Sequence, residues 1–324
     1  MNATPTNLPQ SAIDRAVSAL TLGHLVAIPT ETVYGLAADA TNEQAMAQVF
    51  ALKGRPPDRP LIVHLAAAEQ LSEWALDIPE YARMWAQAFW PGPLTLVLPK
   101  KAHVSTTLTA GQSTVACRVP NHPIALATLA SFGGGLVAPS ANRYGHISPT
   151  TAEAVHEEFG NQTPMVLDGG ACEVGIESTI VACLGSKPEI LRLGMISAEQ
   201  LETVGGVRVN SPGMAPNIVV PGQVSTHYAP RTPCQLLAGP QAVSSFLDAA
   251  SPDLRVGYLG WQPAPSRVEK SVILEGGPAA SAKQLYAGLR ELDQAGLDVI
   301  LVETPPSDQA WAGIRDRLQR ACGP

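Results

Sequence analysis

The sequence predicts a two-domain α/β protein, in which helices cover a mixed sheet and a smaller α/β domain follows. The chain has 324 residues, more than one hydrophobic core usually organises. Short apolar runs of strand length alternate with stretches of helical periodicity along most of the chain. Between about residues 209 and 233 five prolines break this alternation, which predicts a semi-rigid linker. We therefore expect domains at 1–208 and 234–324.

The first domain is expected to begin with a helix at Ser11, since Ser11 and Asp14 have capping-box-like spacing. A polar turn is expected at 29–35, after the first strand. A later helix should open at Ser197, with Gln200 in capping-box register. The other helices are expected at 41–52, 66–76, 80–89 and 123–132. The strands are expected at 25–28, 61–65, 94–98, 113–119, 136–138, 165–167, 178–183 and 189–193.

The second domain resumes the alternation of strands and helices. Strands are expected at 235–237, 256–259, 272–274 and 299–303, and helices at 279–295 and 310–321. This order is typical of a small Rossmann-like domain. Because it lacks the G-x-G-x-x-G pattern, we do not expect a dinucleotide site there.

Composition narrows the class of protein. The net charge of −7 is unusual for a protein that binds nucleic acid through non-specific phosphate contacts. Five cysteines without a C-x-x-C pair are expected to be reduced, buried thiols. No signal-peptide pattern and no apolar run of 18 residues is present, so we expect a cytoplasmic protein without a membrane span. No metal-binding signature occurs, and no metal site is predicted.

A cluster of cations follows the helix at 41–52. Lys53, Arg55 and Arg59 fall within seven positions, and prolines 56, 57 and 60 stiffen the stretch. Three cations held in a stiff loop of an acidic protein favour a polyanion such as triphosphate. The alternative is an ordinary solvated loop whose cations serve the helix dipole.

Polar side chains also follow two predicted strands. Ser140 and Asn142 come after the strand at 136–138, where ligands of open α/β sheets bind. They would suit phosphate oxygens, or they could simply stabilise a turn. Thr30, Thr32 and Tyr34 follow the first strand, and a spacing of two could place them on one side.

Four polar residues interrupt apolar strands. A buried Arg118 needs a carboxylate partner, which could be a substrate carboxylate or a structural Asp or Glu. His64 is either a ligand-binding side chain or a hydrogen-bonded core histidine. Ser178 and Arg192 are similar polar intrusions in later strands.

Taken together, these motifs resemble the YrdC-like family of threonylcarbamoyl-AMP synthases over about residues 10–205. The segments that carry the resemblance are 29–36, 53–61, 139–142, 175–180 and 191–194. The sequences at 221–223, 227–230, 285–293 and 316–318 look like those of the longer, two-domain form. The resemblance implies a twisted mixed sheet with helices, followed by the Rossmann-like domain.

The resemblance also implies an activity: threonylcarbamoyl-AMP would form from L-threonine, bicarbonate and ATP, with Mg²⁺ on the phosphates. The product would serve the modification of adenosine 37 in tRNAs, so tRNA or tRNA-modification proteins are possible partners. The residues implied to be catalytic are Lys53, Arg55, Ser140 and Asn142. Those implied to bind ATP are Lys53, Pro57, Thr114, Ser140, Asn142, Ser148 and Arg192. Those implied to bind threonine are Thr30, Thr32, Tyr34, His64, Arg118, Ala138 and Ser178.

The linker carries a further hypothesis. His227 and Tyr228 form a polar and aromatic pair inside a Pro- and Gly-rich stretch, and we expect them to close over bound ATP. The alternative is a linker that only docks the second domain. Competing functions are a non-catalytic RNA-binding module, or a carbamoyl transferase acting on a protein, although such transferases carry cysteine clusters that this sequence lacks.

Overall fold

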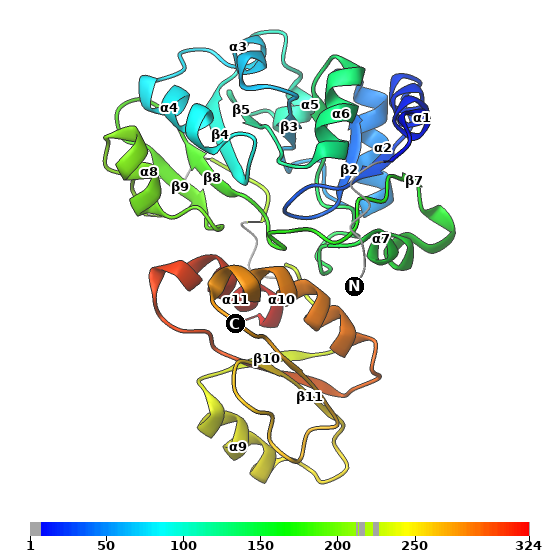
Figure 1. The fold of residues 1–324 in the computed structure, drawn as a ribbon, viewed down its shortest axis with the longest axis vertical. Helices are drawn as coiled ribbons and strands as arrows, with labels where there is room; N and C mark the ends of the chain where they lie inside the picture. The colour runs from blue at the N-terminus through cyan, green and yellow to red at the C-terminus, as the bar shows by residue number, and fades with distance from the viewer. Residues whose placement is uncertain (1–7, 212, 214–217, 223–226, 324) are drawn as a thin grey trace. The chain divides into compact units, whose positions relative to one another are not determined.

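The computed structural model describes residues 8–211, 213, 218–222 and 227–323, and the chain divides into two compact units (Figure 1). Unit 1 contains residues 1–144, 149–173 and 177–223, and unit 2 contains residues 145–148, 174–176 and 224–324. Outside the described residues lie 1–7, which hold most of the N-terminal stretch expected not to be a signal peptide, and parts of the proline-rich linker (212, 214–217 and 223–226). The domain boundaries at 208 and 234 stay predictions.

Unit 1 is built on a nine-stranded mixed sheet with the order β7-β1-β2-β6-β3-β5-β4-β8-β9. Its strands are β1 (Val26–Ile28), β2 (Gly35–Asp39), β3 (Ile62–His64), β4 (Leu94–Pro99), β5 (Thr114–Arg118), β6 (Leu136–Val137), β7 (Met165–Val166), β8 (Thr179–Ala182) and β9 (Glu189–Arg192). Its helices are α1 (Gln10–Thr21), α2 (Glu43–Lys53), α3 (Leu71–Trp74), α4 (Glu80–Phe89), α5 (Thr106–Thr109), α6 (Pro123–Phe132), α7 (Ala152–Phe159) and α8 (Ala198–Gly205), with the 3-10 turns η1 (Ala68–Gln70) and η2 (Gly160–Gln162).

The two faces of this sheet are covered differently. Alternate strand residues such as Val63 and Cys117 pack with α2, α3, α4 and α8 in the main core. On the opposite face, α1 and α6 cover β1, β2 and β6. Further along that face, Val220 of the segment 218–222 packs on Ile62 and Ala116. A described part of the linker thus lies on the sheet of unit 1, where the described residues of the apolar cluster come from strands and from this segment.

Most predicted elements of unit 1 are present, with shifted ends. Helix α1 begins at Gln10 after Pro9, so Ser11 lies inside its first turn and the capping-box prediction is wrong. The capping box of Ser197 and Gln200 is confirmed. Strand β2 falls within residues expected to be turn or unassigned, because its sequence GLAAD has low β propensity and its stability comes from pairing with β1 and β6.

Unit 2 contains a four-stranded parallel sheet with the order β10-β13-β11-β12. Its elements are β10 (Cys234–Leu237), α9 (Pro240–Ala249), β11 (Val256–Gly260), β12 (Lys270–Ile273), α10 (Pro278–Asp293), β13 (Val299–Glu303), η3 (Gln309–Trp311) and α11 (Ala312–Cys322). Helix α9 packs on Tyr258 and Leu301 from one face, and α10 and α11 lie on the other face (Figure 1). This arrangement agrees with the predicted Rossmann-like domain.

Two structural findings concern expectations drawn from the composition, namely the state of the cysteines and the absence of a membrane span. Cys234 and Cys322 form a disulfide between β10 and the end of α11, so the expectation of five reduced thiols is wrong for this pair. Cys117, Cys172 and Cys183 are buried and free, as expected. Among the described residues, no helix is long and apolar enough to cross a membrane.

Candidate active site

Lys53 is a buried clamp rather than part of a solvated loop. Helix α2 ends on Lys53 because Gly54 adopts a left-handed conformation (φ 62°) as its C-cap. The Lys53 side chain is only 3% exposed, and its Nζ donates to the carbonyl oxygens of Ser140 at 2.5 Å and Asn142 at 2.6 Å. Burial, and then the charge of Arg55, hold the pKa of Lys53 well below its ordinary value. The cation thus joins the end of α2 to the Ser140–Asn142 turn.

The three cations of this stretch have different environments. Arg55 is buried, and its Nη2 donates to the carbonyl oxygen of Pro60 at 2.9 Å. Arg59 is partly exposed and forms an ion pair with the exposed Asp58 at 3.7 Å. The solvated-loop alternative is therefore wrong for Lys53 and Arg55, whereas Pro57 is exposed.

The two polar turns lie side by side. The amide of Ala141 donates to the carbonyl oxygen of Tyr34 at 2.8 Å, and Gly35 forms a bridge with Ser140. A Cβ on Gly35 would come within 2.9 Å of the Ala138 Cβ, so glycine permits this close approach. The structure therefore brings the Thr30–Tyr34 turn, Ala138 and the Lys53 clamp together.

The three side chains predicted to form part of the site in the turn at 29–35 fall into two groups. The hydroxyls of Thr30 and Thr32 are 2.9 Å apart, so these two share one side. The Thr30 Oγ1 also accepts from the Val33 amide and stabilises the turn. Tyr34 belongs to the main core, and its hydroxyl donates to the carbonyl oxygen of Gly170 at 2.8 Å.

His64 and Arg118 are direct neighbours on the sheet. They are register partners in the parallel pair β3 and β5, and both alternate with residues of the helix-covered core. Thr114 has the same parity as Arg118, so it belongs to the same face. This is the face on which Val220 packs against Ile62 and Ala116, further along the sheet from α1 and α6.

His64 is a neutral side chain. Burial, and next the charge of Arg118, lower its pKa to about 3. Its Nδ1 lies 3.3 Å from the carbonyl oxygen of Ile62, which is consistent with a hydrogen-bonded buried histidine. An uncharged imidazole beside a guanidinium can donate or accept a hydrogen bond from a polar substrate without adding charge.

The structure supplies an acidic partner for Arg118 that the sequence did not single out. The Arg118 Nη2 lies 2.6 Å from Oε1 of Glu31, and both side chains are buried. The Arg118 Nε donates to the carbonyl oxygen of Gly92 at 3.2 Å. Of the two partners left open above, a structural glutamate is therefore present. The available signal was Glu31 as the carboxylate of the polar turn at 29–35.

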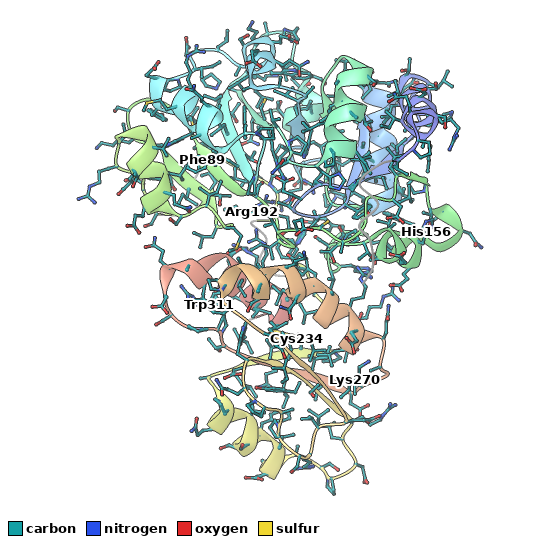
Figure 2. The ribbon with its side chains drawn as sticks, viewed as in Figure 1. Phe89, His156, Arg192, Cys234, Lys270 and Trp311 are labelled. Atoms are coloured by element: carbon teal, nitrogen blue, oxygen red, sulfur yellow. A yellow bond between two sulfur atoms is a disulfide. The ribbon has the colours of Figure 1, made fainter. Side chains whose placement is uncertain are left out.

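Ser178 and Arg192 form a second polar cluster on unit 1. The Ser178 Oγ lies 2.7 Å from the Thr95 hydroxyl and accepts from Arg192 Nη2 at 3.0 Å. Arg192, labelled in Figure 2, ends β9 and also donates to the carbonyl oxygens of Ser178 and Pro221. Arg192 thereby ties the described linker segment to the sheet.

The linker segment has a specific attachment. The Gln112 side chain makes two bonds with the main chain of Val219: its Nε2 donates to the carbonyl oxygen at 3.0 Å, and its Oε1 accepts from the amide at 2.9 Å. Val220 is 3% exposed on the sheet face. A linker was expected at these residues, but its attachment to Gln112 was not predicted.

Three predicted site residues belong to unit 2. Ser148 is fully buried in its segment 145–148. The rings of His227 and Tyr228 lie 4.1 Å apart, and Tyr228 stacks on Tyr286 at 5.8 Å. The Arg317 guanidinium sits 5.1 Å from the Tyr228 ring centroid. The pair is thus held by the aromatic and cationic side chains of α10 and α11.

The geometry defines an α/β protein with buried cations and hydroxyls between two adjoining turns and along one sheet face. A family model described as telomere recombination, and named for Sua5, YciO and YrdC, matches residues 18–194. A second, described as the C-terminal domain of threonylcarbamoyl-AMP synthase, matches residues 196–323. The chain belongs to the Sua5 and YrdC family of threonylcarbamoyl-AMP synthases, and it is an enzyme of the nucleotidyltransferase type.

Relatives and solved structures cover nearly the whole chain. Threonylcarbamoyl-AMP synthases from Pyrococcus abyssi and Bacillus subtilis are both 38% identical, over 93% and 98% of this chain and 91% and 94% of theirs. The crystal structure of P. abyssi Sua5 complexed with L-threonine matches with a TM-score of 0.90 and 37% identity, over 98% of this chain and 95% of that one. This match agrees with the predicted fold class of both units.

Proposed function

We propose that this enzyme makes L-threonylcarbamoyl-AMP from L-threonine, bicarbonate and ATP, with release of pyrophosphate. The observation that carries the proposal is the buried Lys53 clamp. Two of its three N–H groups bond the Ser140 and Asn142 carbonyls, and no third partner occurs among the described residues. The remaining N–H donor suits a phosphate oxygen, and a bound phosphate would itself favour the charged form of Lys53.

The reaction would proceed in two steps. The threonine amine adds to bicarbonate and water leaves, which gives a carbamate. A carbamate oxygen then attacks the α-phosphorus of ATP, and pyrophosphate departs. Positioning and charge stabilisation supply most of the catalysis in phosphoryl-centre reactions, so the proposed site needs no protein nucleophile.

The nucleotide is assigned to the clamp side of the site. Lys53, Ser140 and Asn142 would contact the phosphates, and Arg55 would organise the loop through its bond to Pro60. Mg²⁺ would enter as part of the nucleotide substrate. The further ATP-side residues in this proposal are Pro57, Thr114, Ser148, Arg192, His227 and Tyr228.

L-Threonine is assigned to the sheet face. Arg118 would meet its carboxylate, with the neutral His64 beside it. Thr30, Thr32, Ala138 and Ser178 would complete the pocket, and Tyr34 would support it from the core. The P. abyssi relative was solved as a complex with L-threonine, which supports this substrate class.

We also propose that the product serves the modification of adenosine 37 in tRNAs within the cytoplasm, with catalysis in residues 1–208. A non-catalytic RNA-binding module is the alternative function. It is less well supported, because RNA phosphates are bound by exposed cations, whereas Lys53 and Arg55 are buried.

Pyrophosphate release tests the proposal. With ATP, L-threonine and bicarbonate all present, pyrophosphate should form, and omitting either threonine or bicarbonate should abolish its release. Release that is indifferent to both omissions would refute the assignment. Salt-dependent tRNA binding without ATP turnover would favour the RNA-binding module instead.

A further inference from the structure

Glu31 forms a buried ion pair on the threonine side of the proposed site. Glu31 is 4% exposed and Arg118 is 5% exposed, and Glu31 Oε1 lies 2.6 Å from Arg118 Nη2. Both carboxylate oxygens of Glu31 are engaged, because Oε2 accepts from the amide of Asn121 at 3.0 Å. The carboxylate is therefore fixed by the main chain that follows β5, as well as by the cation.

The ion pair restricts one edge of the guanidinium. Arg118 Nε donates to the carbonyl oxygen of Gly92, while Nη2 faces Glu31. Nη1 has no partner among the described residues, although the rest of the side chain is buried and held. A planar guanidinium that is fixed along one edge can turn only by breaking these contacts.

We propose that Glu31 is a positioning residue, which orients Arg118 so that its Nη1 is presented to the carboxylate of L-threonine. This inference rests on the proposed function. Glu31 does not touch the substrate in this proposal; it acts through Arg118. Without Glu31, the guanidinium keeps its charge but loses the contact that fixes its Nη2, and a misplacement of about 1 Å can cost about a hundredfold in a reacting site.

A rival role for Glu31 is simple neutralisation of a buried charge. The two roles differ in their response to a shorter carboxylate. Glu31→Asp keeps the negative charge but shortens the reach to Arg118, so it should impair threonine binding only if position matters. Glu31→Gln keeps the shape but removes the negative charge that faces Arg118 Nη2, so it should impair threonine binding under either role.

The test is calorimetric binding of L-threonine and, separately, of ATP to the full chain. Both Glu31 variants should bind L-threonine about ten- to a hundredfold more weakly, with ATP affinity changed less than about threefold. Glu189→Gln is the matched control, since Glu189 is also a buried glutamate of unit 1. It should leave both affinities within about threefold of the wild type.

Three outcomes would overturn the inference. Threonine affinity in Glu31→Asp could equal or exceed that of the wild type, which would leave neutralisation of the buried charge as the role of Glu31. Alternatively, adding Glu31→Gln to the Arg118→Gln variant could lower the L-threonine affinity by the same factor as it does in the wild type. That result would mean that Glu31 does not act through Arg118. A wild-type enzyme that binds no L-threonine would refute the proposed function itself, and the inference with it.

Discussion

Replacing Lys53 by methionine removes the ammonium but keeps an apolar side chain of similar length. Two opposing terms determine its effect on stability. The bonds to the Ser140 and Asn142 carbonyls are charge-assisted and are worth about 1.5–3 kcal/mol each. Removing the buried charge also removes a desolvation penalty of about several kcal/mol. We therefore expect the free energy of unfolding to change by less than about 2 kcal/mol.

The expected effect on ATP is larger. Losing one charge-assisted contact to a phosphate, together with the fixed position of the turn, should cost about 2–3 kcal/mol, which is a 30- to 150-fold rise in the KM for ATP. The KM for L-threonine should rise less, because the proposed threonine contacts do not include Lys53. Any rise would come through the turn after β6, whose Leu136 is the register partner of His64. The mutation should thus separate the two substrates.

The assay is threonine-dependent pyrophosphate release at varied ATP, combined with thermal unfolding of the same samples. Lys101→Met is the matched control, because Lys101 is a partly exposed lysine of unit 1 outside the proposed site. An unchanged KM for ATP in Lys53→Met would refute the phosphate-binding role. Unfolding of the variant at the assay temperature would show that the clamp stabilises the fold far more than this balance allows.

Two further predictions concern unit 1. Because the pKa of His64 is lowered to about 3, the unfolded chain takes up a proton below pH 6.5 that the folded protein does not. The free energy of unfolding should therefore fall by about 2 kcal/mol between pH 6.5 and 5. Denaturant titrations should show a smaller fall in His64→Asn. An equal fall in the variant would contradict the lowered pKa of His64. Gln112→Ala removes both hydrogen bonds to Val219, which are worth about 2 kcal/mol in total, and should speed hydrogen exchange of segment 218–222 about 30-fold. Gln87→Ala is the control. Unchanged exchange in Gln112→Ala would mean that apolar packing alone holds the segment.

Elements with a strong local sequence pattern were predicted more accurately than elements with a weak one. Apolar runs such as 94–98 and 256–259 gave strands close to the observed β4 and β11. Strand β2 was missed because alanine and glycine carry little strand signal, and its partners β1 and β6 come from separate parts of the chain. Disulfide pairing of Cys234 with Cys322 likewise depends on the packing of α11 near β10, which spacing alone does not indicate.

The candidate site shows the same limit. Lys53 and Arg118 were singled out from their sequence context, because cations in a proline-rich loop and in an apolar strand are unusual. Their partners were not predicted: the carbonyls that hold Lys53 carry no side-chain signal, and Glu31 faces Arg118 only after β5 is placed beside the first turn. The sequence thus pointed to the cationic side chains of the candidate site, whereas tertiary packing determines which of their donors remain for a ligand.

The partners of the buried cations explain how such a site can be preorganised. Lys53 donates to the main-chain carbonyls of Ser140 and Asn142, which are neutral acceptors that fix the side chain in place. Arg118 differs, because Glu31 offsets its charge while its Nη1 stays available. The clamp therefore leaves one Lys53 N–H for a phosphate oxygen, whereas the Glu31–Arg118 pair on the threonine side is nearly neutral and suits a small zwitterion. Because folding has already desolvated these cations, substrate binding need not supply that free energy, and some stability is given up for an electrostatically prepared site.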